Sequence, residues 1–290
     1  MDCFTFAFVI ERNVMRKLIL FIGLMFSYCL SMFSQTYDER ISRAMDAVEK
    51  DSLQLAEQLL KDALNADPAN MKNALLLSNL GTIQRRMGKN KEAIESYTLA
   101  INKTSFSVTM LLNRASLYLE LDYLEKAYSD YCNVIDLDKT NQEALQFRAY
   151  IYMRKRQYNE ARADYRALLE ENPRNKTARI GIVMVNQKDK RFQEALEILN
   201  LLITDYPKDV SLLKARAEIE VEMNALDLAL LDLENAAKLA PNDTDVYVMC
   251  GDIYMEQNKH REAYVAYEKA IELGVPRPQL QDRLKASKKR

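Results

Sequence analysis

The stretch from Gln142 to Asn175 has the pattern of two short amphipathic helices. Apolar or small residues recur at intervals of three and four on both sides of a polar turn at Lys155–Gln157. Residues at these intervals lie on one face of an α-helix. The pattern therefore predicts two helices joined by a tight turn, each of which buries one face.

The same pattern returns along the chain at a nearly constant interval. Ala161 lies in the second helix of this pair, and equivalent alanines follow one another at steps of 34 residues, except for a first step of 37. These positions are Ala56, Ala93, Ala127, Ala161, Ala195, Ala229 and Ala263. Self-similarity at this period is typical of a solenoid of helix pairs, in which each pair buries its apolar face against its neighbours.

Two further sets of positions recur in phase with these alanines. A large side chain follows each alanine by four residues, on the same helical face; these residues are Leu60, Tyr97, Tyr131, Tyr165, Leu199, Leu233 and Tyr267. A mostly small residue precedes each alanine by twelve positions, at Ala44, Gly81, Ala115, Ala149, Val183, Ala217 and Gly251. We expect these small side chains to let the two helices of a pair approach closely.

Prolines mark the ends of several units. Pro68, Pro173, Pro207 and Pro241 follow their alanines by twelve residues, and Pro276 follows by thirteen. A proline ring has no backbone N–H and stops a helix. We therefore expect the second helix of these units to end there, whereas the second and third units lack such a proline.

Together these residues resemble the tetratricopeptide repeat family from about Tyr37 to Arg277. The resemblance implies an all-α fold, a right-handed superhelical solenoid of about seven helix-turn-helix repeats with a C-terminal capping helix. The predicted repeats are 37–73, 74–107, 108–141, 142–175, 176–209, 210–243 and 244–277. No linker rich in Pro, Gly or Ser interrupts the array, which predicts one continuous domain at 37–277, followed by a capping helix and basic tail at 278–290. Val183 departs from the Gly or Ala that the family prefers.

Residues 1–34 lie outside the repeat pattern. A basic start at Met15-Arg16-Lys17 precedes an uncharged, mostly apolar run of 16 residues from Leu18 to Phe33. This is the layout of a secretory signal peptide. We expect translation to begin at Met15 and the protein to be exported to the periplasm or cell envelope. The alternative is a retained membrane anchor, although 16 residues are short for a membrane span.

Composition and charge limit the classes of function that the protein can have. Charged residues make up 29% and hydrophobic residues 48% of the chain, which suits thin helix pairs with much exposed surface. A net charge of −1 argues against nucleic acid as a partner, because phosphate binding needs a basic surface. Beyond residue 34 the cysteines are Cys132 and Cys250, in the third and seventh repeats. Repeats contact only their neighbours, so we expect packing roles rather than a disulfide.

The sequence contains no arrangement that indicates catalysis. His260, the single histidine, is predicted to lie solvated in the turn of the last repeat. There is no CxxC, no HExxH, no glycine-rich phosphate loop and no cluster with metal-ligand spacing. We therefore expect no enzyme activity, no catalytic residue, no metal, no cofactor and no small-molecule substrate.

Arginine and aspartate occur together in three repeats. Arg114, Arg148 and Arg216 each stand one residue before the small position of the first helix, and Asp130, Asp164 and Asp232 stand in the second helices of the same repeats. Other repeats lack the aspartate. The co-occurrence predicts an ion pair between the two helices of one repeat, which would fix their geometry more than it would add stability.

The resemblance also implies a binding groove formed by the first helices. Carried onto this sequence, the groove includes Asn79 and Asn113, whose amides can bond both groups of a ligand backbone. An adaptable apolar middle follows at Phe147, Tyr150, Met153, Ile180 and Met184, with inter-repeat packing as the alternative for Ile180 and Tyr150. Ser78 and Thr82 stand where the family's clamp for a C-terminal carboxylate needs a lysine and an asparagine, so we do not expect that ligand.

Charge changes along the predicted groove. Basic residues belong to the earlier repeats, at Arg85, Arg86, Arg154 and Lys188, and acidic residues to the later ones, at Glu218, Glu222, Asp245, Asp252 and Glu256. We expect a ligand to bind in one direction, with its acidic end toward the second repeat.

The sequence thus predicts a scaffold that binds a protein or peptide, in the assembly of a bacterial envelope complex. Two alternatives remain: a periplasmic holder of extended polypeptides, and a regulatory or substrate-presenting subunit of a separate enzyme. Membrane contact is expected only through an uncleaved signal segment. The partner itself is not specified by these residues.

Overall fold

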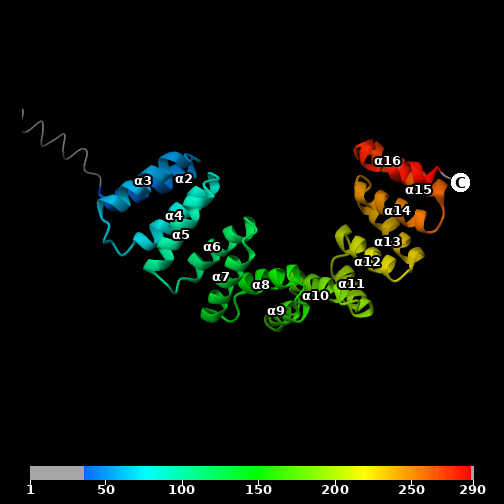
Figure 1. The fold of residues 1–290 in the computed structure, drawn as a ribbon, viewed down its shortest axis with the longest axis horizontal. Helices are drawn as coiled ribbons and strands as arrows, with labels where there is room; N and C mark the ends of the chain where they lie inside the picture. Colours follow the sequence, from blue (N-terminus) through cyan, green and yellow to red (C-terminus); the bar gives the residue numbers. More distant parts are fainter. Residues whose placement is uncertain (1–35, 289–290) are drawn as a thin grey trace, which may run out of the picture. The chain divides into compact units, whose positions relative to one another are not determined.

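The computed structural model describes residues 36–288, and every regular element in that range is an α-helix (Figure 1). The helices are α2 (Tyr37–Glu49), α3 (Leu53–Ala66), α4 (Asn73–Arg86), α5 (Asn90–Lys103), α6 (Val108–Glu120), α7 (Leu124–Leu137), α8 (Gln142–Arg154), α9 (Tyr158–Glu171), α10 (Lys176–Lys188), α11 (Phe192–Asp205), α12 (Val210–Glu222), α13 (Leu226–Leu239), α14 (Thr244–Glu256), α15 (His260–Glu272) and α16 (Arg277–Ser287). The predicted all-α helical-repeat fold is confirmed. The predicted signal segment at residues 1–34 lies outside the described residues.

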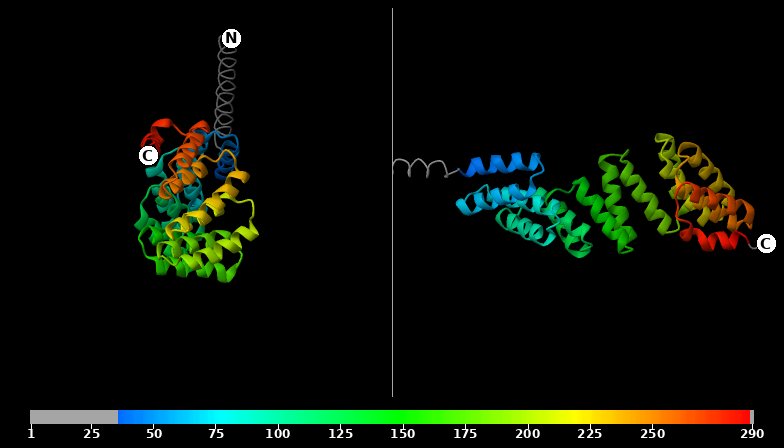
Figure 2. Two further views of the ribbon diagram at one scale, coloured as in Figure 1. Left: turned by 90° about the vertical axis from the view of Figure 1, so that its right-hand side faces the viewer. Right: turned by 90° about the horizontal axis from the view of Figure 1, so that it is seen from above.

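The chain forms two compact units, and within each unit consecutive helices pair and stack in chain order. We call the first helix of each repeat helix A (α2, α4, α6, α8, α10, α12, α14) and the second helix B (α3, α5, α7, α9, α11, α13, α15). Helix α16 packs against α15, as the two views of Figure 2 show, and it buries Leu280 and Leu284. Within residues 36–288, no helix is both long and apolar enough to cross a bilayer.

The helix A to helix B turn has the same backbone conformation in every repeat. One residue there adopts a positive φ of 54° to 74°, at Asp51, Gly88, Asp122, Arg156, Lys190, Asn224 and Asn258. This left-handed conformation lets helix B fold back on helix A within three residues, and Asp and Asn tolerate it better than most side chains. Arg156 and Lys190 lack that tolerance and adopt it because the flanking helices are packed.

Polar caps and prolines set the helix boundaries. The side chains of Asn141 and Asn175 accept hydrogen bonds from the backbone N–H groups of Ala144 and Ala178, at 3.1 and 3.0 Å, which caps α8 and α10. At the other end, helices α3, α9, α11 and α13 each stop two residues before a proline; these are Pro68, Pro173, Pro207 and Pro241. These helices end where the prolines predicted, but α5 and α7 end at the equivalent positions without a proline, and Pro276 lies four residues after the end of α15.

The core of each repeat is a contact between its small and large positions. All seven recurring alanines of helix B are 0% exposed. The residue at the small position of helix A faces the large residue sixteen positions later, and their sizes compensate. Glycine faces tyrosine at Gly81/Tyr97 and Gly251/Tyr267, whereas Val183 faces the smaller Leu199. The departure of Val183 from the family pattern is thus matched by a smaller partner.

The chain divides into two compact units between Asn133 and Val134, near the end of α7. The first unit contains α2 to α6 and most of α7, and one of its cores joins α2 and α3 to Leu76, Leu80 and Ile83 of α4. The second unit contains α8 to α16, with successive cores over α10–α12, α12–α14 and α14–α16.

The predicted arginine–aspartate pairs are confirmed in all three repeats. Arg114 donates from Nε and Nη2 to both carboxylate oxygens of Asp130, each at 2.8 Å. Arg148 pairs in the same way with Asp164 at 2.9 and 2.7 Å, and Arg216 with Asp232 at 2.6 and 2.6 Å. Each aspartate is buried, so the fork of two parallel bonds links helix A to helix B at a fixed register.

Glu220 of α12 is a buried carboxyl group without such a partner. Its Oε2 atom is excluded from solvent and makes no hydrogen bond. Burial and, to a smaller extent, nearby Asp232 raise its pKa while Arg216 lowers it, and the net result is a pKa of about 7. Glu57 of α3 provides the contrast: burial alone would raise its pKa, but hydrogen bonds from Lys61, Lys89 and Gln84 lower it to about 2.

Glu220 should therefore make the stability of the second unit depend on pH. The carboxyl group binds its proton more tightly in the folded than in the unfolded chain, so folding is favoured while it is protonated. We expect the free energy of unfolding to fall as the pH rises from about 4.5 to about 7. Urea unfolding at pH 5 and pH 8 measures this, and Glu220→Gln should reduce the difference. An unchanged pH dependence in that variant would contradict this assignment.

Candidate functional site

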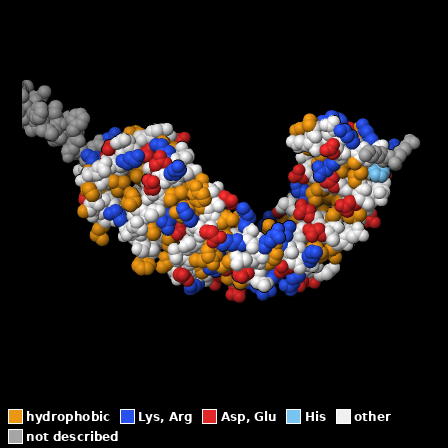
Figure 3. Space-filling model, viewed as in Figure 1, with side chains coloured by type: hydrophobic (Ala, Val, Ile, Leu, Met, Phe, Trp, Pro, Cys, Tyr) orange, Lys and Arg blue, Asp and Glu red, His pale blue; other side chains and the backbone are white. Residues whose placement is uncertain are grey.

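The helix-A face of the second unit is hollowed by a cavity of about 390 Å³, which we call the acidic cavity. Helices α10, α12 and α14 line it, through Gln187, Lys188, Glu218, Val221, Glu222, Met249, Asp252, Ile253 and Glu256. Because one face of each helix A is left uncovered by helix B, residues at equivalent positions of three successive repeats meet here. Figure 3 shows acidic side chains clustered among apolar ones over this part of the surface.

The carboxylates of the acidic cavity differ in their partners. Asp252 is bound by Arg283 of α16 at 2.7 and 3.1 Å and by the hydroxyl of Tyr267 at 2.7 Å. Glu222 accepts a hydrogen bond of 2.5 Å from the amide of Gln187. Glu218 and Glu256 are exposed and have no ion pair with any residue between 36 and 288.

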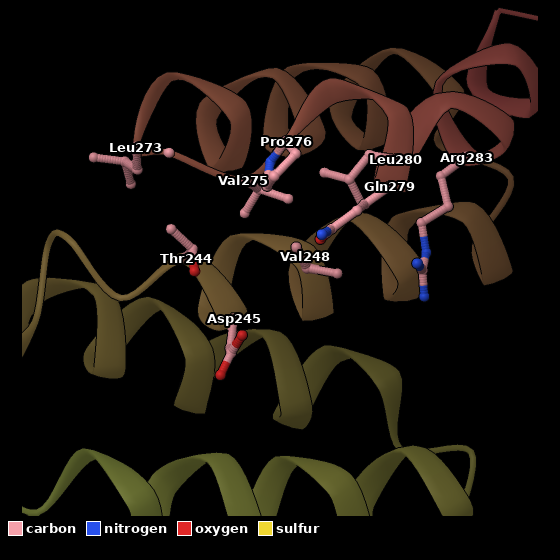
Figure 4. Close-up of a pocket in the computed structure, with 10 residues that line it drawn as sticks. Thr244, Asp245, Val248, Leu273, Val275, Pro276, Gln279, Leu280 and Arg283 are labelled. Carbon is pink, nitrogen blue, oxygen red and sulfur yellow. The ribbon is translucent and has the colours of Figure 1, made fainter.

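A second cavity of about 490 Å³, the capping cavity, lies between α14 and α16. In Figure 4, Gln279, Leu280 and Arg283 project from α16 toward α14, which contributes Thr244 and Val248. Asp245 points away from α16, and Lys214 of α12 binds it at 3.5 Å. Arg283 lines this cavity while it binds Asp252 of the acidic cavity, so the two cavities adjoin along one face.

In the first unit, the predicted groove residues are partly engaged. Asn79 and Asn113 are half-buried, and the amide of Asn113 lies 3.5 Å from the hydroxyl of Ser78. Arg85 binds both carboxylate oxygens of Glu120, one of them at 2.9 Å. Arg86 points the other way, to Asp51 at 2.8 Å. These two adjacent arginines thus reach opposite neighbours and do not form one basic patch.

The predicted apolar middle is only partly accessible. Tyr150 is 40% and Met184 46% exposed, and the hydroxyl of Tyr150 accepts a bond of 3.2 Å from Arg154. Phe147 and Met153 are half-buried. Ile180 packs against the core around Val183 and Leu199, so its role is inter-repeat packing. The structure brings five of the charged residues predicted along the groove into the acidic cavity: Lys188, Glu218, Glu222, Asp252 and Glu256. Binding roles of the others stay predictions.

A third cavity, of about 500 Å³, lies on the helix-B side and was not predicted from the sequence. Tyr247, Cys250 and Tyr254 of α14 line it together with residues of α13 and α15, including Ala266. Cys250 and Ala266 occupy the places that arginine and aspartate hold in three other repeats, and two small residues leave this space unfilled. That substitution is the sequence signal that could have revealed the cavity. Burial raises the pKa of the Cys250 thiol to about 11.

The single histidine is not placed as predicted. His260 is the first residue of α15 rather than a turn residue, and it is half-buried, with a solvent-excluded Nδ1 that makes no hydrogen bond. Within the described range, no group of three or more His, Cys, Asp or Glu side chains is arranged to hold a metal ion.

A stack of helix pairs that leaves one face of each helix A open is the architecture of a helical-repeat binding protein. Comparisons with known proteins identify the family. Models of the tetratricopeptide repeat match residues 76–107, 108–141, 152–219 and 244–273. A crystal structure of a tetratricopeptide repeat protein from Parabacteroides merdae is 35% identical, with a TM-score of 0.69, over 88% of this chain and 100% of that one. The chain belongs to the tetratricopeptide repeat family, whose members are protein-interaction scaffolds.

Two more distant similarities concern parts of the chain. YrrB, described as a TPR protein with an unusual peptide-binding site, has a TM-score of 0.51 at 22% identity, over 68% of this chain and 100% of that one, and this likeness shows the fold alone. Human DnaJ homolog subfamily C member 7 is 34% identical over 97 residues. That match covers 33% of this chain and 20% of the human protein.

Proposed function

We propose that the protein is a non-enzymatic scaffold that binds an extended peptide or a partner helix along its helix-A face, in the assembly of a bacterial envelope complex. Membership of a family of protein-interaction scaffolds supports the class of function. The signal-peptide pattern of residues 15–33 and the similarity to a Parabacteroides merdae protein support export in a bacterium.

One observation carries the binding site: the acidic and capping cavities adjoin on one face of the second unit. Together they offer a continuous groove along α10, α12, α14 and α16. Apolar side chains such as Val221 and Val248 form part of its lining, and charged groups lie at its rim. A concave surface of this kind suits an extended segment, since pockets take alternate side chains and polar groups fix the register.

A second candidate is a holder of many extended polypeptides. Asn79 and Asn113, half-buried at equivalent positions of α4 and α6, favour it, because amides bond a peptide backbone without regard to sequence. Affinity purification from the producing cells separates the two. We expect a defined partner in fixed proportion, whereas a broad mixture of clients would favour the holder.

Site-specific photo-crosslinking tests the groove directly. A photoreactive phenylalanine analogue in place of Val248, in the capping cavity, should crosslink the partner in the producing cells. The same analogue in place of Val265, which is 61% exposed on the helix-B side, is the matched control and should give little product. Equal crosslinking from both positions, or crosslinking from Val265 alone, would overturn the assignment of the helix-A face.

A further inference from the structure

We infer that the acidic cavity binds a lysine or arginine side chain of an extended partner segment. The inference rests on the proposed function and specifies the chemistry of the ligand. It depends on the charge that the cavity leaves unneutralised, on the contrast with the other repeats, and on the shape of its lining.

The cavity carries an excess of negative charge. Its lining includes four carboxylates, Glu218, Glu222, Asp252 and Glu256, against one cation, Lys188. Arg283 neutralises Asp252 from α16. Four negative and two positive groups leave a net charge of −2 at one concave site, where walls of low dielectric strengthen the field.

The arrangement brings like charges together within each helix. Glu218 and Glu222 are four residues apart on α12, and Asp252 and Glu256 are four apart on α14, so each pair lies on one helical face. Like charges at this spacing destabilise a helix. On α14, Arg283 already offsets the charge of Asp252, so a cation bound between α12 and α14 would chiefly relieve the repulsion between Glu218 and Glu222.

The other repeats do not share this arrangement. The position of Glu218 and Asp252 is occupied elsewhere by Met45, Thr82, Ser116, Tyr150 and Met184, and that of Glu222 and Glu256 by Glu49, Arg86, Glu120, Arg154 and Lys188. In the third repeat, the single acid Glu120 is neutralised by Arg85 within the chain. Only the sixth and seventh repeats have acids at both positions, and for Glu218 and Glu256 the described chain supplies no cation.

The lining suits a long cationic side chain better than a small ion. Val221, Met249 and Ile253 form the apolar part of the cavity, below the carboxylates. Lysine and arginine bury an apolar stem and keep the charged end among polar groups. A lysine or arginine of a segment bound along the groove would thus place its aliphatic stem on these residues and its charged group near Glu218 and Glu256.

Peptide binding tests the inference. Fluorescence anisotropy would compare a labelled peptide of alternating serine and lysine with peptides of the same length that carry norleucine or glutamate instead of lysine. We expect the purified protein to bind the lysine peptide most tightly. Glu218→Gln/Glu256→Gln should weaken this binding about tenfold, since each variant carboxamide loses a charge-assisted hydrogen bond.

The matched control is Glu234→Gln/Glu262→Gln, which changes the net charge equally but at the third cavity on the helix-B side. It should leave binding of the lysine peptide unchanged. Equal weakening by both double variants, or equal binding of the lysine and norleucine peptides, would overturn the inference. Light scattering tests one further outcome. A dimer that depends on charge, in which the basic helix α16 of a second copy occupies the cavity, would also overturn the inference.

The two proposals can fail separately. If Val248 still crosslinks a partner while the lysine peptide shows no preference, the groove binds a ligand but not through a cation. If the lysine peptide binds and Val248 gives no crosslink, the cavity recognises a cation while the proposed scaffold function fails.

Discussion

Replacing Arg114 with leucine is expected to destabilise the first unit by about 3 to 5 kcal/mol, because the change leaves a buried carboxylate without its cation. The Asp130 side chain is 4% exposed and both of its oxygens accept from the guanidinium. Arg114 also donates to the hydroxyl of Thr98 at 3.0 Å, and that bond would be lost as well. Urea unfolding followed by circular dichroism measures the loss.

The double variant Arg114→Leu/Asp130→Ser should recover a large part of that stability. It reproduces the second repeat, where Leu80 and Ser96 stand in the equivalent places and are buried. With both charged groups gone, no desolvated carboxylate remains, so the ion pair should contribute more to geometry than to net stability. Additive effects of the two single changes in a double-mutant cycle would show that the pair is not coupled.

The sequence predicted the parts of the fold that depend on short, rigid residues at fixed spacing. The recurring alanines and the small positions have few ways to pack, and the structure buries the alanines completely in every repeat, while four of the prolines each follow the end of helix B by two residues. The pairing of Arg114 with Asp130 was predictable for a related reason. The aspartate occurs only in the three repeats that also have the arginine, and only Arg43 of the first repeat stands without it, so the co-occurrence predicted the contact.

Long charged side chains were harder to place. Arg85 and Arg86 were both predicted to line the groove, but each reaches a carboxylate in a neighbouring repeat, on opposite sides. An arginine side chain can reach several acids at similar cost, and the repeat period fixes the backbone without choosing among them. The chemistry of the candidate groove is therefore less predictable from sequence than the helices that form it.

Cavities and buried acids were not predicted for a different reason. The third cavity arises where Cys250 and Ala266 are both small, and Glu220 is 8% exposed beside Arg216 of α12 and Asp232 of α13. Each effect depends on the joint size of residues in different helices. A pattern based on one helix at a time does not contain that information.

Replacing Gly251 with valine should destabilise the seventh repeat by about 3 kcal/mol, toward the upper end of overpacking effects. A Cβ atom at this position would lie 2.4 Å from the ring of Tyr267. That tyrosine is 1% exposed, so its ring cannot move into solvent unless α14 and α15 separate. A displaced ring would also lose the 2.7 Å bond from its hydroxyl to Asp252. Hydrogen exchange of the α14 and α15 amides, together with urea unfolding, measures the effect.

A second substitution should reverse much of this loss. In the fifth repeat Val183 packs against Leu199, so Gly251→Val/Tyr267→Leu recreates a combination that the chain already uses. In the double variant Asp252 still pairs with Arg283, so its carboxylate keeps a cationic partner. We expect Tyr267→Leu alone to be destabilising, because it leaves a void beside glycine, and the double variant to be more stable than either single one. A double variant less stable than Gly251→Val would contradict the view that the small and large positions compensate in volume. The packing of this repeat would then be set by other residues.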